Sequence, residues 1–114
     1  MPYLKIQTNQ AIETATQVEL MQQASQRVAE ALSKPERYVM VALQPETPLL
    51  FAGNDAPAAY LELKSIGLPD EATASLSATL CGFVTEALEI PQERIYIEFA
   101  NAARHLWGWD GRTF

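Results

Sequence analysis

Hydrophobic and polar positions follow two different periods along this chain. Apolar residues alternate with polar ones over residues 3–8, which predicts a strand with two different faces. Between residues 20 and 32 they recur every three or four residues, which predicts an amphipathic helix. The same order returns in the second half of the chain. The expected elements are strands at residues 3–8, 38–43, 58–66 and 94–99, a helix that ends near Ser33 and a second helix that ends before Pro91.

Two further signals concern the start of the first helix and the place of the second strand. Thr16 and Glu19 have the spacing of a capping box, with Thr14 and Gln17 as the alternative. The strand at residues 38–43 (YVMVAL) is apolar on both faces, so we expect it at the centre of a sheet.

The two halves of the chain share sequence at one constant offset. Three pairs of dipeptides match at an offset of 57 residues, as residue 3 and residue 60 do. They link equivalent expected elements, which indicates a duplicated βαβ unit, about residues 1–57 and 58–114, within a single domain. In each unit we expect parallel strands and a right-handed crossover. The matching dipeptides are Tyr3-Leu4 with Tyr60-Leu61, Ala15-Thr16 with Ala72-Thr73, and Glu36-Arg37 with Glu93-Arg94.

The element order predicts an α/β fold of the α+β sandwich type, in which a four-stranded mixed sheet carries two helices on one face. Two helices leave the other face of the sheet uncovered, and residues such as Met40, Val41, Tyr96 or Ile97 would lie there, depending on register. Because a large apolar face is rarely left in water, we expect an oligomer in which the sheets face each other.

Composition narrows the classes of partner. A chain of 114 residues, 48% of them hydrophobic, is long enough for one domain with its own core. The net charge of −6 argues against a nucleic acid or an anionic membrane as partner. The single Cys81 excludes an internal disulfide and is expected to pack beside the second helix's apolar stripe. Because no leader and no membrane-length apolar run is visible, we expect a cytoplasmic location, although leaderless secretion leaves no trace in a sequence.

The chain begins with Met1 and Pro2, directly before the first strand. If Met1 is removed, Pro2 presents a secondary amine that a rigid strand holds in place. An α-amine has a pKa of roughly 7.7–8.0, close to working pH, and an apolar pocket or a nearby cation lowers it further. Such an amine suits a general base. From these two residues alone, an ordinary N-terminus is the simpler interpretation.

Several motifs are spread over essentially the whole chain: MPYLKIQTN at 1–9, KPERYVMVAL at 34–43, SIG at 65–67, LCG at 80–82, PQERIYIEF at 91–99, GW at 108–109 and TF at 113–114. With Pro2, they occur in the same order and at nearly the same spacing as in the family of macrophage migration inhibitory factor and D-dopachrome tautomerase, within the tautomerase superfamily. The resemblance implies a homotrimer with active sites between subunits, and a keto–enol tautomerase whose base is the N-terminal proline. We expect no cofactor and no metal.

The resemblance also implies roles for single residues. Pro2 matches the catalytic base, and Lys34 matches the cation that binds the substrate carboxylate or enolate oxygen. Ile66 would offer its backbone N–H to the substrate, and Tyr96 would reach the pocket from a neighbouring subunit. The other expected pocket residues are Trp107, Trp109 and Phe114 as walls, Phe51 at the rim, and Glu98. Without the resemblance, Lys34 would be a solvated lysine at a helix end, and the aromatic residues a tail packed on the domain.

This chain departs from the family pattern at several positions. Glu98 stands where the cytokine has an asparagine, and a carboxylate there would repel an anionic substrate or interact with Lys34. Trp107 stands where the cytokine has a small aliphatic residue, and it would either narrow the pocket or stack on aromatic rings. The CxxC motif of the cytokine is absent, because Ala58 and Leu61 stand in its place, so we expect no thiol–disulfide oxidoreductase activity based on it. The only histidine is assigned no catalytic role.

Two classes of function follow. The first is an isomerase that interconverts keto and enol forms of aromatic α-keto acids such as phenylpyruvate, with dopachrome-type compounds as further substrates. The second is a binding or signalling module with a vestigial pocket. An amine and a cation together favour the enzyme, because a binding module needs neither. Dehalogenation or decarboxylation by the same proline is a third alternative, for which no acidic or basic groups can be assigned.

Overall fold

A computed structural model describes all 114 residues. Helices and strands follow one another twice in the order strand, helix, strand, and a short hairpin ends the chain. The elements are β1 (Tyr3–Thr8), α1 (Thr14–Leu32), β2 (Met40–Gln44), β3 (Ala59–Ile66), α2 (Thr73–Leu88), β4 (Ile95–Ala102), β5 (Gly108–Trp109) and β6 (Arg112–Thr113). All four expected strands and both helices are therefore present, with bounds that differ by a few residues.

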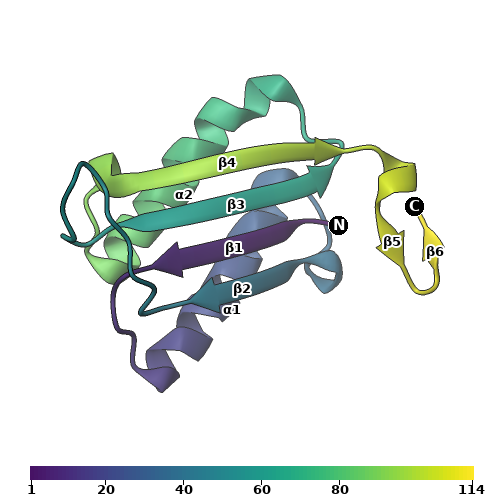
Figure 1. Cartoon of the computed structure of the whole chain (residues 1–114). Helices are drawn as coiled ribbons and strands as arrows, with labels where there is room; N and C mark the ends of the chain where they lie inside the picture. Colours follow the sequence, from purple (N-terminus) through teal and green to yellow (C-terminus); the bar gives the residue numbers. More distant parts are fainter.

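The four long strands form one mixed sheet in the order β2-β1-β3-β4. β1 is parallel to β2 and β3 is parallel to β4, whereas the central pair β1 and β3 is antiparallel. Both helices cover the same face of this sheet (Figure 1). The expected mixed sheet with two helices on one face is confirmed. The prediction that the second strand lies at the centre is wrong, because β2 is an edge strand.

The period of two in β1 explains how the sheet separates a core from an open face. Leu4 and Ile6 are fully buried against the helices, and the residues between them are only half-buried. β3 repeats this pattern with Leu61 and Leu63. The apolar stripes of α1 and α2 close the core, which includes Cys81 as expected. Burial of such aliphatic side chains is the main stabilising term, at roughly 1.5–3 kcal/mol each.

The first helix begins differently from the capping-box prediction but ends where the sequence predicted. α1 starts at Thr14, and its N-cap, Glu13, makes no side-chain capping hydrogen bond. Instead, the Gln17 side chain donates a 2.7 Å hydrogen bond to the carbonyl of Ile12, before the helix. Both capping boxes are therefore wrong. The predicted end near Ser33 is confirmed, because Ser33 has a left-handed backbone conformation and its N–H bonds back to the last turn.

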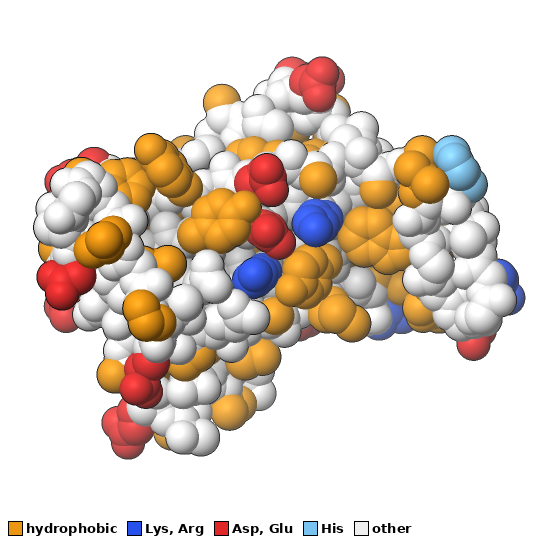
Figure 2. All heavy atoms as spheres, in the orientation of Figure 1, with side chains coloured by type: hydrophobic (Ala, Val, Ile, Leu, Met, Phe, Trp, Pro, Cys, Tyr) orange, Lys and Arg blue, Asp and Glu red, His pale blue; other side chains and the backbone are white.

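The open face of the sheet has a charged centre with apolar residues around it (Figure 2). Met40 and Tyr96 are 66% and 65% exposed on the two edge strands. Between them, on β3 and β4, the Tyr60 hydroxyl contacts the carboxylates of Glu62 and Glu98 at 3.3 and 3.2 Å. Partial burial, followed by the Glu98 carboxylate, raises the pKa of Tyr60 to about 12. The apolar rim is the feature from which the sequence predicted an oligomer.

Chain segments at the two ends of the sheet are held by different contacts. At one end Arg94 donates hydrogen bonds to four carbonyls of residues 51–57, which fixes the loop before β3. At the other end the β5–β6 hairpin projects past the sheet (Figure 1), turning at Asp110 and Gly111 with positive φ. No helix of the structure is long and apolar enough to cross a membrane.

Candidate active site

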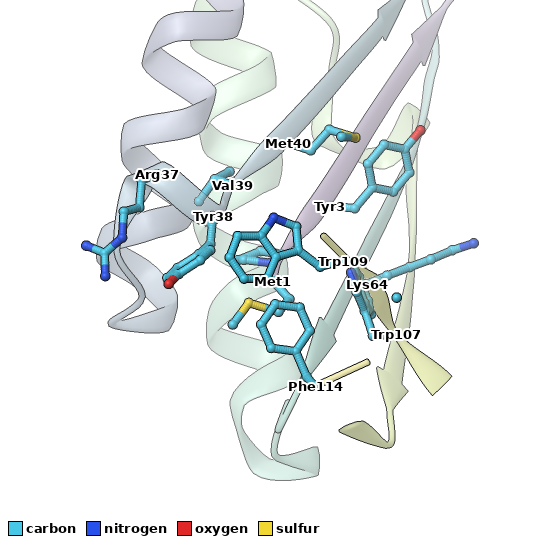
Figure 3. A pocket seen from close by; sticks show the side chains of 12 residues that line it. Met1, Tyr3, Arg37, Tyr38, Val39, Met40, Lys64, Trp107, Trp109 and Phe114 are labelled. Carbon is cyan, nitrogen blue, oxygen red and sulfur yellow. The ribbon is translucent and has the colours of Figure 1, made fainter. Parts of the chain in front are cut away.

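A cavity of about 390 Å³ opens beside the N-terminus, where β1 begins and β3 ends. We call it the N-terminal cavity. Its lining comes from four parts of the chain that the fold brings together, and most of the lining residues are hydrophobic. Figure 3 shows their side chains around the chain start. The lining residues are 1–3, 37–40, 64, 107–109 and 114.

Pro2 lies at the buried end of this cavity. Its side chain is fully buried, and its carbonyl accepts a 3.0 Å hydrogen bond from the N–H of Met40 on β2. This bond continues the parallel β1–β2 ladder to the start of the chain, so Pro2 is held by the sheet. The terminal amine of a chain processed at Met1 would therefore lie at a fixed place in an apolar environment.

The N-terminal amine has a perturbed pKa in this environment. Burial, and then the positive charge of Lys34, lower the pKa of the Met1 amine below its ordinary value. Both effects disfavour the ammonium form. Removal of Met1 would make the nitrogen of the buried Pro2 the terminal amine. A lowered pKa leaves more of the amine unprotonated at neutral pH, as a general base requires.

Lys34 and Ile66 meet at the edge of the N-terminal cavity. Lys34 follows the left-handed residue that ends α1, and its Nζ donates a 3.3 Å hydrogen bond to the carbonyl of Ile66 at the end of β3. The Ile66 side chain is buried in the core. Neither residue lines the cavity directly, yet Lys34 acts on the amine at its floor. The role of the Ile66 N–H stays a prediction.

Aromatic rings form the wall of the N-terminal cavity. Trp109 and Phe114 are stacked, with ring centroids 5.5 Å apart and an interplanar angle of 13°. Both meet Tyr38 edge-on, at 5.9 and 6.4 Å. Trp107 lines the same cavity from the segment before β5. The three aromatic residues that the resemblance placed in the pocket wall are thus together, and they offer a surface on which a planar ring can stack.

Phe51, Tyr96 and Glu98 lie apart from this cavity. We call them the β4 patch. Tyr96 is near the start of β4, at the end of the sheet away from the chain start, and its ring is 4.7 Å from that of Phe51. Glu98 follows on the same face and is bound by Tyr60. None of the three lines the N-terminal cavity, so a single subunit does not bring all the predicted site residues together.

Sequence reasoning missed several residues that line the cavity. Tyr38 and Arg37 form a short 3-10 turn before β2, and Met40 and Lys64 flank Tyr3 in the sheet register. One signal was present: a parallel pairing of β1 and β2 places the residues before both strands at the same end. The antiparallel pairing with β3, which brings Lys64 to Tyr3, was not predictable from the repeat.

No group of three or more His, Cys, Asp or Glu side chains is placed to hold a metal ion. The side chains that line the N-terminal cavity include two cations, Arg37 and Lys64, and no Asp or Glu, in a chain of net charge −6. The site thus combines a buried secondary amine after Met1 removal, a nearby lysine and stacked aromatic rings. This set can bind a planar anion and move a proton at an adjacent carbon.

Comparison with known proteins agrees with this geometry. Residues 1–114 match the family model described as macrophage migration inhibitory factor (MIF). A macrophage migration inhibitory factor homolog from Trichuris trichiura is 36% identical over 115 residues and is covered completely, as is this chain. The crystal structure of a homologue from Prochlorococcus marinus has a TM-score of 0.92 and 42% identity, with 98% of each chain covered. The factor from Trichinella spiralis has a TM-score of 0.90 and 33% identity, covering 98% of this chain and 99% of its own. The chain belongs to the macrophage migration inhibitory factor family.

Proposed function

We propose that this protein is a keto–enol tautomerase of the cytoplasm that acts on aromatic α-keto acids such as phenylpyruvate, and on dopachrome-type compounds. The observation that carries the proposal is the buried Pro2 at the floor of an aromatic cavity, with Lys34 close enough to act on the terminal amine. After Met1 is removed, this amine is a base with a lowered pKa that is already held in position.

The proposed reaction moves one proton. The aromatic ring of the substrate stacks on Trp109 and Phe114, and its carboxylate binds Lys34. The lone pair of the Pro2 nitrogen takes a proton from the carbon next to the carbonyl, and the electron pair shifts onto the carbonyl oxygen. The positive charge of Lys34 stabilises the resulting enolate. The protonated Pro2 nitrogen then gives its proton to the oxygen, which completes the enol and regenerates the free amine, and the reverse steps return the keto form.

We propose a homotrimer in which the site is completed between subunits. The β4 patch is exposed, and it holds the residues that the resemblance assigns to a neighbouring subunit. Tyr96 and Glu98 point to the same side of β4, so a neighbour that receives one at its N-terminal cavity also receives the other. The exposed Met40 and Tyr96 on the open face support an assembly that covers this face.

A binding or signalling module is the alternative function. Glu98 favours it, because a carboxylate beside the cavity would weaken the binding of an anionic keto acid. In this case the N-terminal cavity would be a vestige, and the trimer surface would make the contacts. The enzyme hypothesis is supported by Pro2, Lys34 and the aromatic wall, because a protein that only binds partners does not need a buried amine.

The test compares the wild-type protein with Pro2→Gly in the conversion of phenylpyruvate from enol to keto form, followed by absorbance. The glycine variant keeps a terminal amine but loses the secondary amine and its rigid ring. We expect turnover to fall about 10²–10⁴-fold, as for loss of a positioned general base. Circular dichroism and light scattering check that fold and assembly are retained. Unchanged turnover would remove Pro2 from the mechanism.

A further inference from the structure

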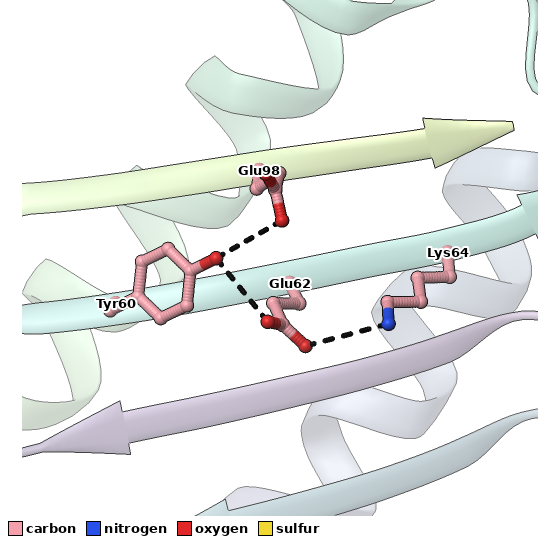
Figure 4. Close-up of polar contacts among 4 residues, drawn as sticks. All are labelled: Tyr60, Glu62, Lys64 and Glu98. Atoms are coloured by element: carbon pink, nitrogen blue, oxygen red, sulfur yellow. Dashed lines mark hydrogen bonds and ion pairs between the residues drawn. The ribbon is translucent and has the colours of Figure 1, made fainter.

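Lys64 connects the N-terminal cavity with the charged centre of the open face. Its side chain lines the cavity, and its ammonium extends away from Trp109 and Phe114 (Figure 3). There Nζ lies 3.9 Å from Oε2 of Glu62, two residues earlier on β3 (Figure 4). The aliphatic part of the Lys64 side chain therefore lines the cavity, and its ammonium is part of the charged centre of the open face.

The contact between Lys64 and Glu62 is weak and exchangeable. Its 3.9 Å separation is long for an ion pair, and the two side chains are 46% and 21% exposed. Exposed pairs of this kind contribute little net stability. Glu62 also has a second partner, because the Tyr60 hydroxyl lies 3.3 Å from its other oxygen (Figure 4). The Lys64 ammonium can therefore move away from Glu62 while the Glu62 carboxylate keeps its hydrogen bond from the Tyr60 hydroxyl.

Lys64 is also the more adaptable of the two cations that line the cavity. The other, Arg37, has its guanidinium carbon 4.7 Å from the centre of the Tyr38 ring, and it lies beyond that ring as seen from Trp109 (Figure 3). It is held by this stacking. A lysine carries a compact charge on four rotatable carbons, so its head can turn toward an anion that enters the cavity.

We propose that Lys64 is a second anion-binding residue of the N-terminal cavity, which exchanges Glu62 for the substrate and so selects aromatic keto acids that carry a second anionic group. The inference rests on the proposed function, in which Lys34 binds the first carboxylate. The second group is one at the far side of the ring, such as a ring carboxylate. No Asp or Glu side chain of the same subunit lines the cavity, so no acidic side chain of that subunit competes there with a second anionic group for Lys64.

The experiment measures binding rather than turnover. Phenylacetate and 4-carboxyphenylacetate share a ring and one carboxylate, and only the second ligand carries the additional anion. Dissociation constants are taken from quenching of Trp107 and Trp109 fluorescence, since both line the cavity. The measured quantity is the preference for the dianion over the monoanion, which cancels effects common to both ligands.

Three variants are expected to change the preference for the dianion in different ways. Lys64→Gln should reduce the preference for the dianion roughly three- to tenfold, because one attractive charge is lost in a half-exposed site. Glu62→Gln should raise it, because the competitor for Lys64 is neutralised. Arg27→Gln is the control: it removes the same charge from α1, where the guanidinium lies over Phe83, and should leave the preference unchanged.

The proposal is overturned if the wild-type protein shows no preference for the dianion, or if Lys64→Gln keeps it. It is also overturned if Arg27→Gln lowers the preference equally, since net charge would then be the cause. Equal binding of both ligands with intact phenylpyruvate conversion removes this inference alone. A clear preference without any conversion removes the proposed function and leaves Lys64 as an anion-binding residue.

Discussion

The two ends of the sheet differ in what each could contribute to a site. At the end where β1 begins, the chain forms a cavity with a buried Pro2 and a wall of stacked aromatic rings. At the other end, the β4 patch presents the Phe51 and Tyr96 rings, which contact each other and enclose no cavity with Glu98. The N-terminal cavity can hold a ligand, whereas the β4 patch can only cover a ligand that is bound elsewhere.

In the proposed homotrimer, this difference would let two neighbouring subunits form a site that neither contains alone. Both ends come from equivalent parts of the two βαβ units, at the starts of β1 with β2 and of β3 with β4. Only the first unit carries the N-terminal amine. A head-to-tail arrangement that places the β4 patch of one subunit against the N-terminal cavity of the next would join the two halves, and closed rings are the stable form of such contacts.

Subunit complementation is the strongest test of whether the two ends of the sheet form one shared site. Pro2→Gly disables the cavity end and Tyr96→Ala disables the patch end, so each variant alone should be nearly inactive. When the two are unfolded, mixed equally and refolded, a site with Pro2 from one subunit and Tyr96 from the next forms by chance. Recovery to about a quarter of wild-type turnover is expected, since two subunits are each drawn at random. No recovery would show that the ends do not share a site.

The next largest effect concerns Lys34 at the cavity end. Lys34→Gln should lower kcat/KM for phenylpyruvate about 10²-fold through loss of enolate stabilisation. It should also move the rising limb of the pH profile. The unprotonated amine is the base, so activity is lost as pH falls through its pKa; without Lys34 that pKa rises, and the limb shifts to higher pH. A limb in the same place would mean that Lys34 does not act on the amine.

At the patch end, a variant of Arg94 tests whether the fixed loop at residues 51–57 contributes to stability and assembly. Its guanidinium lies 5.1 Å from the Phe51 ring centre and donates to four carbonyls of the loop. Arg94→Ala should lower the free energy of unfolding by about 2 kcal/mol, the range for loss of charged hydrogen bonds, and should weaken assembly. Denaturant unfolding and light scattering measure both. Arg104→Ala, whose Nε donates to the Phe114 carbonyl, is the matched control at the cavity end.

The smallest expected effect is at Glu98. Glu98→Asn removes a carboxylate from the β4 patch and should raise turnover of phenylpyruvate several-fold, if this side chain meets the anionic substrate in a neighbouring cavity. Tyr60, which contacts Glu98 at 3.2 Å, retains its contact with Glu62. A steady-state comparison of kcat and KM decides the point. An unchanged or lower rate would place Glu98 away from the substrate or make it a required group.

The sequence predicted the layers of this fold better than the order of its strands. The period of two in β1 and the helical stripes were sufficient to predict the elements and the covered face. They could not place β2 at the edge, because an apolar strand that an oligomer covers has the same pattern as a central one. The capping boxes failed for a local reason: Gln17 bonds to a carbonyl before the helix instead of closing a box.

The sequence predicted less of the candidate site than of the fold. Pro2 was noticeable from the residues, but Lys34 and the tail aromatics gained roles only from the family resemblance, because isolated residues of these types are common on surfaces. Tyr38 and Lys64 were missed because the antiparallel β1–β3 pairing and the docking of the tail decide their position. The internal duplication stays a prediction, although the two βαβ units repeat the same order of elements.

The most direct test of the account is a paired measurement on one sample: intact mass, followed by phenylpyruvate enol-to-keto conversion. The central claim is that the secondary amine of Pro2, freed from Met1, is the base. A mass without methionine should accompany fast conversion, and a fraction that retains Met1 should gain activity when an aminopeptidase removes it. Protein that lacks Met1, is folded and assembled, and yet converts no phenylpyruvate would contradict the claim.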